Sequence, residues 1–116
     1  MSHEKYEEYQ ECISACQNCV VACNHCAACC LQEPQVQHMA RCIGLDMDCA
    51  QSCQLAIALM AGGSDFAPRA CELCAEVCEA CAEECGRHDA DHCQQCAEAC
   101  RLCADHCRNI ALAAVA

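Results

Sequence analysis

Small apolar residues recur along most of this chain at alternating spacings of three and four, with polar residues between them. This is the a/d spacing of a heptad, which places the apolar positions on one stripe of an α-helix. The clearest examples run from Cys71 to Cys85 and from Cys93 to Cys107, on either side of the break GRHDADH. The residues between the stripe positions are mostly Ala, Glu, Gln, Arg and Leu, which are good helix formers. The pattern therefore predicts amphipathic helices.

Four segments carry this periodicity, and no segment alternates in the way a strand does. At 116 residues, the chain has the length of one small domain, so we expect a single domain over residues 1–116. Four helices joined by short connections predict an all-α, antiparallel up-down-up-down four-helix bundle. The helices are expected at roughly 4–31, 35–61, 66–86 and 90–114.

Proline and glycine separate the predicted helices. Pro34 cannot continue the first helix and suits the first turn of the second. The pair Gly62-Gly63 is expected to end the second helix. Side-chain caps are expected from Ser64 or Asp65 for the third helix and from Asp89 for the fourth.

Cysteine fills the positions that normally hold leucine or isoleucine in a bundle. The chain has 20 cysteines, and nineteen of them fall on the four stripes; Cys29 is the exception. The second stripe is mixed, because Met39, Asp46 and Met60 share it with three thiols. A buried carboxylate needs partners, so we expect Asp46 to accept hydrogen bonds from a neighbouring helix rather than bind metal. The stripe cysteines are Cys12, Cys16, Cys19, Cys23, Cys26, Cys30, Cys42, Cys49, Cys53, Cys71, Cys74, Cys78, Cys81, Cys85, Cys93, Cys96, Cys100, Cys103 and Cys107.

A core of thiols fills space poorly but binds soft metal well. Eight Cys-x-x-x-Cys pairs lie along the stripes, and side chains at i and i+4 share a helix face. Two such thiolates can hold one ion of low coordination number, which favours Cu(I). One Cu(I) per thiolate also leaves the interior neutral, whereas one Zn(II) per four thiolates leaves two negative charges at each site. All 20 cysteines are candidate ligands, and the alternative is a zinc or general soft-metal buffer of metallothionein type.

Several other classes fit the sequence less well. The net charge of −11 argues against a nucleic-acid partner, which needs a basic face. No stretch of 18 uncharged apolar residues predicts a membrane span, and the N-terminus MSHEKYEEYQE lacks the apolar region of a signal peptide. We therefore expect a cytoplasmic protein with reduced thiols, not a secreted disulfide scaffold. Iron–sulfur loops and redox Cys-x-x-Cys units are also not matched, so no enzyme activity is predicted.

Histidines cluster near one predicted end of the bundle. In an antiparallel bundle, the first and third connections lie at the same end, which brings His88 and His92 close to Cys30, Cys85 and Cys93. The hypothesis is that metal enters there, with His88 and His92 as peripheral or transfer ligands. The opposite end is expected to be closed by an apolar plug formed by Met60, Phe66 and Ile110.

These motifs resemble those of a known family, the four-helix-bundle copper storage proteins of bacteria in their cytosolic form. The resemblance covers nearly the whole chain, through the runs CISACQNCVVACNHC and CIGLDMDCAQSC, the HDADHC junction and the two C-terminal cysteine runs. It implies a protein that fills its core with many Cu(I) ions through the Cys-x-x-x-Cys pairs. It also implies a homotetramer, and the partners we expect are copper ions and a copper chaperone or small thiol that donates them.

Overall fold

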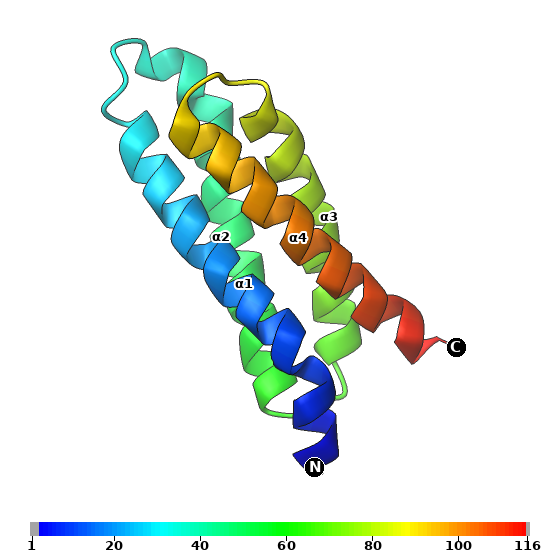
Figure 1. The fold of residues 1–116 in the computed structure, drawn as a ribbon. Coiled ribbons are helices and arrows are strands. Elements are labelled where there is room, and N and C mark those ends of the chain that lie inside the picture. Colours follow the sequence, from blue (N-terminus) through cyan, green and yellow to red (C-terminus); the bar gives the residue numbers. More distant parts are fainter. Residues whose placement is uncertain (1–2, 116) are drawn as a thin grey trace.

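The computed structural model describes residues 3–115 and contains four long α-helices (Figure 1). A short 3-10 helix precedes the second of them, and no strand occurs within this range. The elements are α1 (His3–Cys30), η1 (Val36–Met39), α2 (Ala40–Ala61), α3 (Ala67–Gly86) and α4 (Asp91–Ala114).

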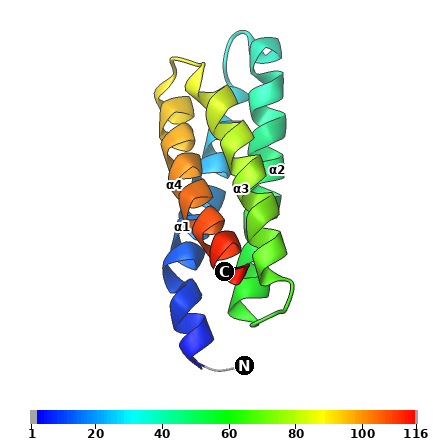
Figure 2. The same ribbon diagram turned by 90° about the vertical axis from the view of Figure 1, so that its right-hand side faces the viewer.

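The helices form an up-down-up-down bundle about 50 Å long and 21 by 18 Å across (Figures 1 and 2). Each helix packs against the next one in the chain, and α4 packs back against α1 to close the bundle. The α1–α2 and α3–α4 connections lie at one end, and both termini point toward the other. The predicted all-α, four-helix architecture is confirmed.

The end of α2 shows why the glycine pair is needed there. Gly63 adopts a φ of 64°, the left-handed region that glycine enters without a steric penalty. The Ser64 N–H donates to Leu59 O at 2.9 Å, and the Gly63 N–H donates to Met60 O at 3.1 Å. This pair of hydrogen bonds is the Schellman motif, which satisfies carbonyls at the end of a helix.

The helix starts differ from the sequence prediction. The α-helical part of α2 begins at Ala40 rather than at residue 35, because Gln35 lies outside the helical region (φ −113°, ψ 65°) and η1 follows it. Neither α3 nor α4 has a side-chain cap. Ser64 lies two residues before the N-cap position of α3, so its hydroxyl accepts from the Phe66 N–H and closes a turn instead. The predicted caps from Ser64, Asp65 and Asp89 were wrong.

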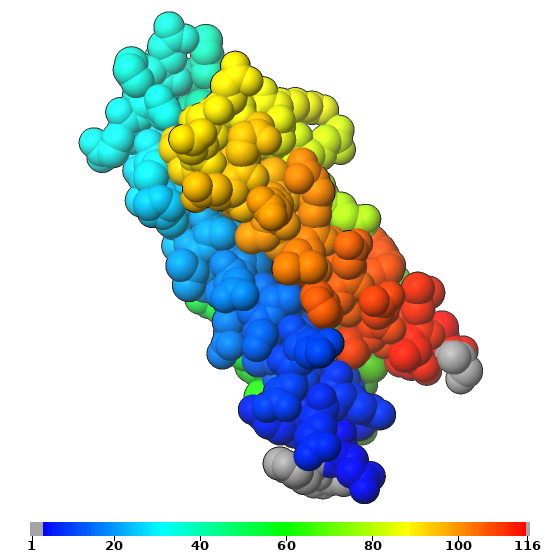
Figure 3. Space-filling model, viewed as in Figure 1, coloured from blue at the N-terminus to red at the C-terminus, as the bar shows by residue number. Residues whose placement is uncertain are grey.

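The core is a column of sulfur flanked by alanine. The nineteen stripe cysteines are all buried, with exposed fractions of 0–2%, while Cys29 is only partly buried. Alanines such as Ala56, Ala75 and Ala97 are buried beside them, and their small size allows the helices to approach closely. Side chains of α1 and α4 meet along the face shown in Figure 3.

The predicted apolar plug is only partly present. Met60 is fully buried and Ile110 packs partly against the core, but Phe66 is 61% exposed. Phe66 is the N-cap residue of α3, so it lies in the turn outside the bundle axis and its ring faces solvent. Among residues 3–115, no helix combines the length and hydropathy needed to cross a membrane.

Candidate metal centre

All four α-helices contribute thiols to the core. The shortest contacts join different helices: Cys42 Sγ lies 3.2 Å from Cys85 Sγ, and Cys49 Sγ lies 3.4 Å from Cys78 Sγ. Five of the eight predicted i,i+4 pairs also have sulfurs within 4 Å, at 3.8 to 3.9 Å. Contacts between helices are therefore at least as close as the contacts within one helix. One column of neighbouring sulfurs results, and all 20 cysteines in it or beside it are free thiols.

The thiols form groups of four that overlap. In each group the four sulfurs lie within 4.8 Å of one another and could hold a metal ion. Cys53 and Cys103 belong to two of these groups, as do Cys19, Cys23 and Cys100. A thiolate that serves two neighbouring groups at once must bridge two metal ions. The geometry therefore suits a continuous cluster better than a set of separate tetrahedra. Five of the groups are Cys16/Cys53/Cys74/Cys103, Cys19/Cys53/Cys78/Cys103, Cys19/Cys23/Cys49/Cys100, Cys23/Cys81/Cys96/Cys100 and Cys26/Cys30/Cys42/Cys93.

Asp46 is fully buried inside this column. Its Oδ1 accepts hydrogen bonds from the thiols of Cys81, Cys85 and Cys96 at 3.2 to 3.4 Å. Burial, and then the neighbouring thiols of Cys96 and Cys81, raise the pKa of Asp46 to about 10. The carboxyl group is therefore protonated and neutral near pH 7. The prediction that Asp46 accepts hydrogen bonds from neighbouring helices is confirmed.

The interior contains few polar groups. Among the side chains of residues 4–115, the only buried polar or charged ones are Asp46, Ser52 and Glu84, so none of these residues supplies a buried cation. Ser52 donates to Cys49 O on its own helix, and Glu84 lies at the edge of the bundle. Burial raises the pKa of Cys93 to about 11, so this thiol keeps its proton near neutral pH. Any metal that enters must displace protons and bring its own positive charge.

His92 lies at the end where the two connections meet. Its Nδ1 is 3.5 Å from Cys93 Sγ, 3.7 Å from Cys26 Sγ and 3.9 Å from Cys30 Sγ. Its Nε2 donates to Glu33 Oε1 at 2.9 Å. With the proton on Nε2, the lone pair of Nδ1 faces three thiols. A carboxylate that holds a histidine ring in this way is common around metal sites, where it fixes the tautomer and raises the basicity of the ligand.

His88 is placed differently, although it lies at the same end. Its Nε2 is 2.8 Å from Glu84 Oε2, one turn earlier on α3. Glu84 also lies 3.6 Å from Arg41 and 3.5 Å from Arg87. The structure thus brings His92 to the thiols and holds His88 in a charged cluster at the rim.

Sequence reasoning missed the contact of Glu33 with His92. The position of Glu33 before Pro34 marked only the end of a helix, although an acidic residue in a loop near histidines was a usable signal. The Glu33–His92 contact spans 59 residues, so only the packing of α4 on α1 reveals it. Cys29, counted among the candidate ligands, lies outside the column.

The model of the copper storage protein family matches residues 5–112 of this chain. The chain belongs to the copper storage protein family. It is 52% identical over 87 residues to the cysteine-rich protein YhjQ of Bacillus subtilis, which covers 74% of this chain and 81% of that protein. This assignment agrees with the buried thiol column.

Solved structures of the family share the fold. The Cu(I)-bound form of the copper storage protein BsCsp3 has a TM-score of 0.87 at 50% identity, covering 90% of this chain and 98% of that one. A cytosolic copper storage protein from Streptomyces lividans, with five coppers, has a TM-score of 0.89 at 38% identity, covering 96% of this chain and 98% of that one. The fold of the family therefore extends over nearly the whole chain.

Proposed function

We propose that this protein stores and buffers many Cu(I) ions in its bundle core, bound by the nineteen buried cysteines. The observation that carries this function is the overlap of the four-thiol groups in an interior to which residues 4–115 contribute no buried cation. Bridging thiolates with one monovalent ion each give a neutral core, and thiolate ligands favour Cu(I). Separate zinc sites would instead each carry two negative charges in a dry interior.

We place the loading end at His92. The thiols of Cys26, Cys30 and Cys93 are the part of the column that contacts an imidazole, and the His92 side chain is 15% exposed. His92 is proposed as a ligand at this end. His88 is proposed only as a transfer ligand, because it must first leave Glu84 to reach a thiol.

Localisation and assembly are proposed on separate grounds. One of them is described as cytosolic, and reduced thiols persist in the cytosol, so we propose that the protein acts there. A copper chaperone or a small thiol would then supply the copper. Assembly into a homotetramer is proposed from the family resemblance.

An anaerobic titration of the reduced protein with Cu(I), against a competing chelator, tests the proposal. Saturation at about 15–20 ions per chain is expected, which is nearly one ion per thiol. Saturation near about five ions, with zinc displacing copper, would indicate tetrahedral sites and a zinc buffer instead. A matched titration of the Cys53→Ala variant should lower the capacity by more than one ion, because Cys53 belongs to two overlapping groups.

A further inference from the structure

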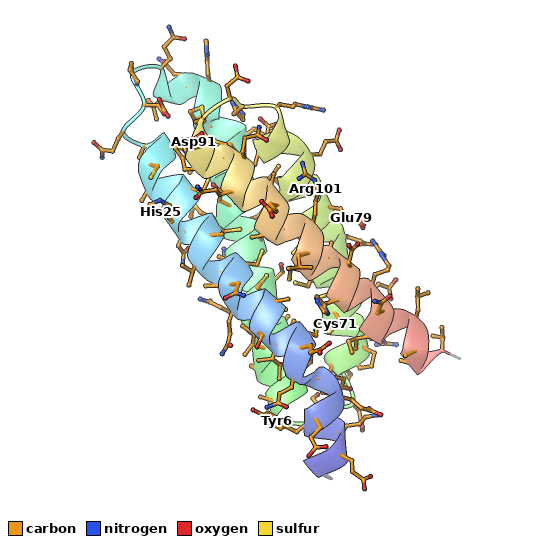
Figure 4. All side chains as sticks on the ribbon, in the orientation of Figure 1. Tyr6, His25, Cys71, Glu79, Asp91 and Arg101 are labelled. Atoms are coloured by element: carbon orange, nitrogen blue, oxygen red, sulfur yellow. The ribbon has the colours of Figure 1, made fainter. Side chains whose placement is uncertain are left out.

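Cys29 pairs with a histidine on the outside of the bundle. Cys29 Sγ lies 3.5 Å from Nε2 and 4.0 Å from Nδ1 of His25, one turn earlier on α1. His25 is exposed and Cys29 is partly exposed; Figure 4 shows His25 at the end of α1 that leads into the α1–α2 connection. Within residues 3–115, neither side chain has another hydrogen-bond or ion-pair partner.

The geometry of this pair fits one metal ion with two protein ligands. Zinc–sulfur and zinc–imidazole bonds, which indicate the scale for a first-row metal ion, are about 2.3 and 2.0 Å long. An ion bound to Cys29 Sγ and to one ring nitrogen of His25 spans the observed sulfur–nitrogen distance of 3.5 or 4.0 Å when the S–metal–N angle is bent. A small rotation of either side chain opens this angle further. Two ligands, a thiolate and an imidazole, suit a soft monovalent ion of low coordination number. Zinc would need two more ligands than the pair offers.

The pair also lies next to the proposed loading end. His25 directly precedes Cys26, and Cys29 directly precedes Cys30, so the outer and inner pairs occupy the same two turns of α1. Cys26 and Cys30 are the two thiols of α1 that His92 contacts from α4. Unlike those buried thiols, Cys29 can be reached by a donor molecule from solvent.

We propose that His25 and Cys29 form a separate surface site that accepts one Cu(I) from a thiol-bound donor before the ion enters the column at Cys26 and Cys30. This inference rests on the proposed storage function. The transfer is a ligand exchange: the bond from copper to Cys29 Sγ forms as the Cys29 proton leaves, and the bond from copper to the donor sulfur breaks. The released donor thiolate takes up a proton. Copper remains Cu(I) throughout.

Nuclear magnetic resonance of the histidine rings tests whether the site binds copper. The reduced protein, labelled with nitrogen-15, is titrated anaerobically with Cu(I) bound to glutathione. The ring nitrogens of His25 are expected to shift with the first equivalents, and this shift should be absent in the Cys29→Ala variant. The Asn18→Ala variant is the control: it truncates an exposed side chain on the same helix and removes no thiol, so its His25 shift should persist.

Stopped-flow uptake from the same copper–glutathione donor tests the acceptor role. Cys29→Ala and His25→Ala are expected to load several-fold more slowly than the wild type, and Asn18→Ala at the wild-type rate. Circular dichroism checks the fold of each variant; positions 25 and 29 lie outside the core, so unchanged helix content is expected. His25 resonances that stay unshifted up to saturation would overturn the site. Wild-type loading rates in both surface variants would overturn its role as acceptor.

Failure of the storage function has a different signature. It is measured by the wild-type capacity, whereas the surface site is measured by the His25 resonances and the loading rates. The storage function would be rejected, and the surface site retained, if the wild type bound only about five ions per chain while copper still shifted the His25 resonances in the wild type and not in Cys29→Ala. Full capacity with an unshifted His25 would reject the surface site and retain storage.

Discussion

Glu33 lies at the rim of the bundle and reaches the thiol core only through His92. It touches no thiol; it holds the Nε2 of His92, and so directs Nδ1 toward Cys26, Cys30 and Cys93. Glu33 is therefore a positioning residue. Its effect should appear in the rate of loading and not in the final capacity, because the buried thiols proposed to hold the metal remain in place.

Replacement of Glu33 by Ala is expected to slow copper uptake by about tenfold, the lower end of the effect seen when such orienting partners are removed. Glu33→Gln should be intermediate, since the amide oxygen still accepts from Nε2 but carries no charge. Uptake from a Cu(I)–thiol donor and total capacity are measured together. Glu98→Ala, which removes an exposed acid on α4, is the control for net charge. Equal rates for Glu33→Ala and Glu98→Ala would contradict the positioning role.

Asp46 makes the stability of the metal-free protein depend on pH. Its pKa of about 10 in the folded state lies far above the ordinary value of 3.8. Between these values the folded chain holds a proton that the unfolded chain has lost. Stability is therefore highest below the unfolded pKa and falls as pH rises toward the folded one. The loss is at most about 1.4 kcal/mol per pH unit.

Replacement of Asp46 by Asn removes this titration while keeping the shape of the side chain. The free energy of unfolding of metal-free Asp46→Asn, relative to the wild type, should rise as the pH increases from about 5.5 to 7.5, a range between the ordinary pKa values of glutamate and cysteine. Urea unfolding at several pH values measures it. Asp48→Asn, which changes an exposed acid on the same helix, is the control for the substitution itself. A pH-independent difference for Asp46→Asn would mean that this carboxyl is already ionised in the folded state.

At the scale of the element, two glycines in or beside α2 have opposite roles. Gly63 adopts a positive φ after the last turn, which costs a residue with a Cβ about 1–2 kcal/mol. Gly44 lies inside the helix, and a Cβ built there meets nothing within 4 Å. Gly44 therefore costs conformational entropy when the chain folds, and the absence of a side chain there brings no packing advantage.

Gly63→Ala is therefore expected to destabilise the metal-free protein by about 1–2 kcal/mol. Gly44→Ala should stabilise it by about 0.5–1 kcal/mol. Chemical denaturation of the two variants side by side measures both effects. A destabilised Gly44→Ala variant would indicate that another chain packs on this exposed turn of α2, as assembly into a tetramer would allow.

At the scale of the whole molecule, copper should stabilise a bundle that already exists. The thiols are buried and in mutual contact, and the helices end in hydrogen-bonded turns of the backbone itself. Metal shared between helices then adds binding free energy to the folded state. Even one site adds about 2.7 kcal/mol to the free energy of unfolding when the free copper concentration is about 100 times the dissociation constant of that site.

Loading with Cu(I) is expected to raise the unfolding temperature by at least roughly 10–20 °C for a domain of this size, with little change in helix content. Thermal unfolding followed by circular dichroism, before and after anaerobic loading, measures both quantities. Removal of the copper by a chelator should restore the original transition. A helical signal that appears only after copper is added would show instead that metal drives folding.

Sequence periodicity by itself determined the all-α class, the four helices and the inward placement of nineteen cysteines, with Cys29 outside. These properties depend on spacing within one helix, and a spacing of three and four repeats with the turn of the helix whatever the helix packs against. The same argument could not place Phe66, the start of α2 or the caps, because these depend on the path of the connections.

Only the tertiary structure decided which thiols meet. The contacts of Cys42 with Cys85 and of Asp46 with three thiols join different helices, and the contact of Glu33 with His92 joins the α1–α2 connection to α4. They depend on how far one helix is shifted along its neighbour, which no local spacing specifies. The sequence thus determined that sulfur lines the core, and the packing of the four helices determined that the sulfurs form overlapping groups rather than separate sites.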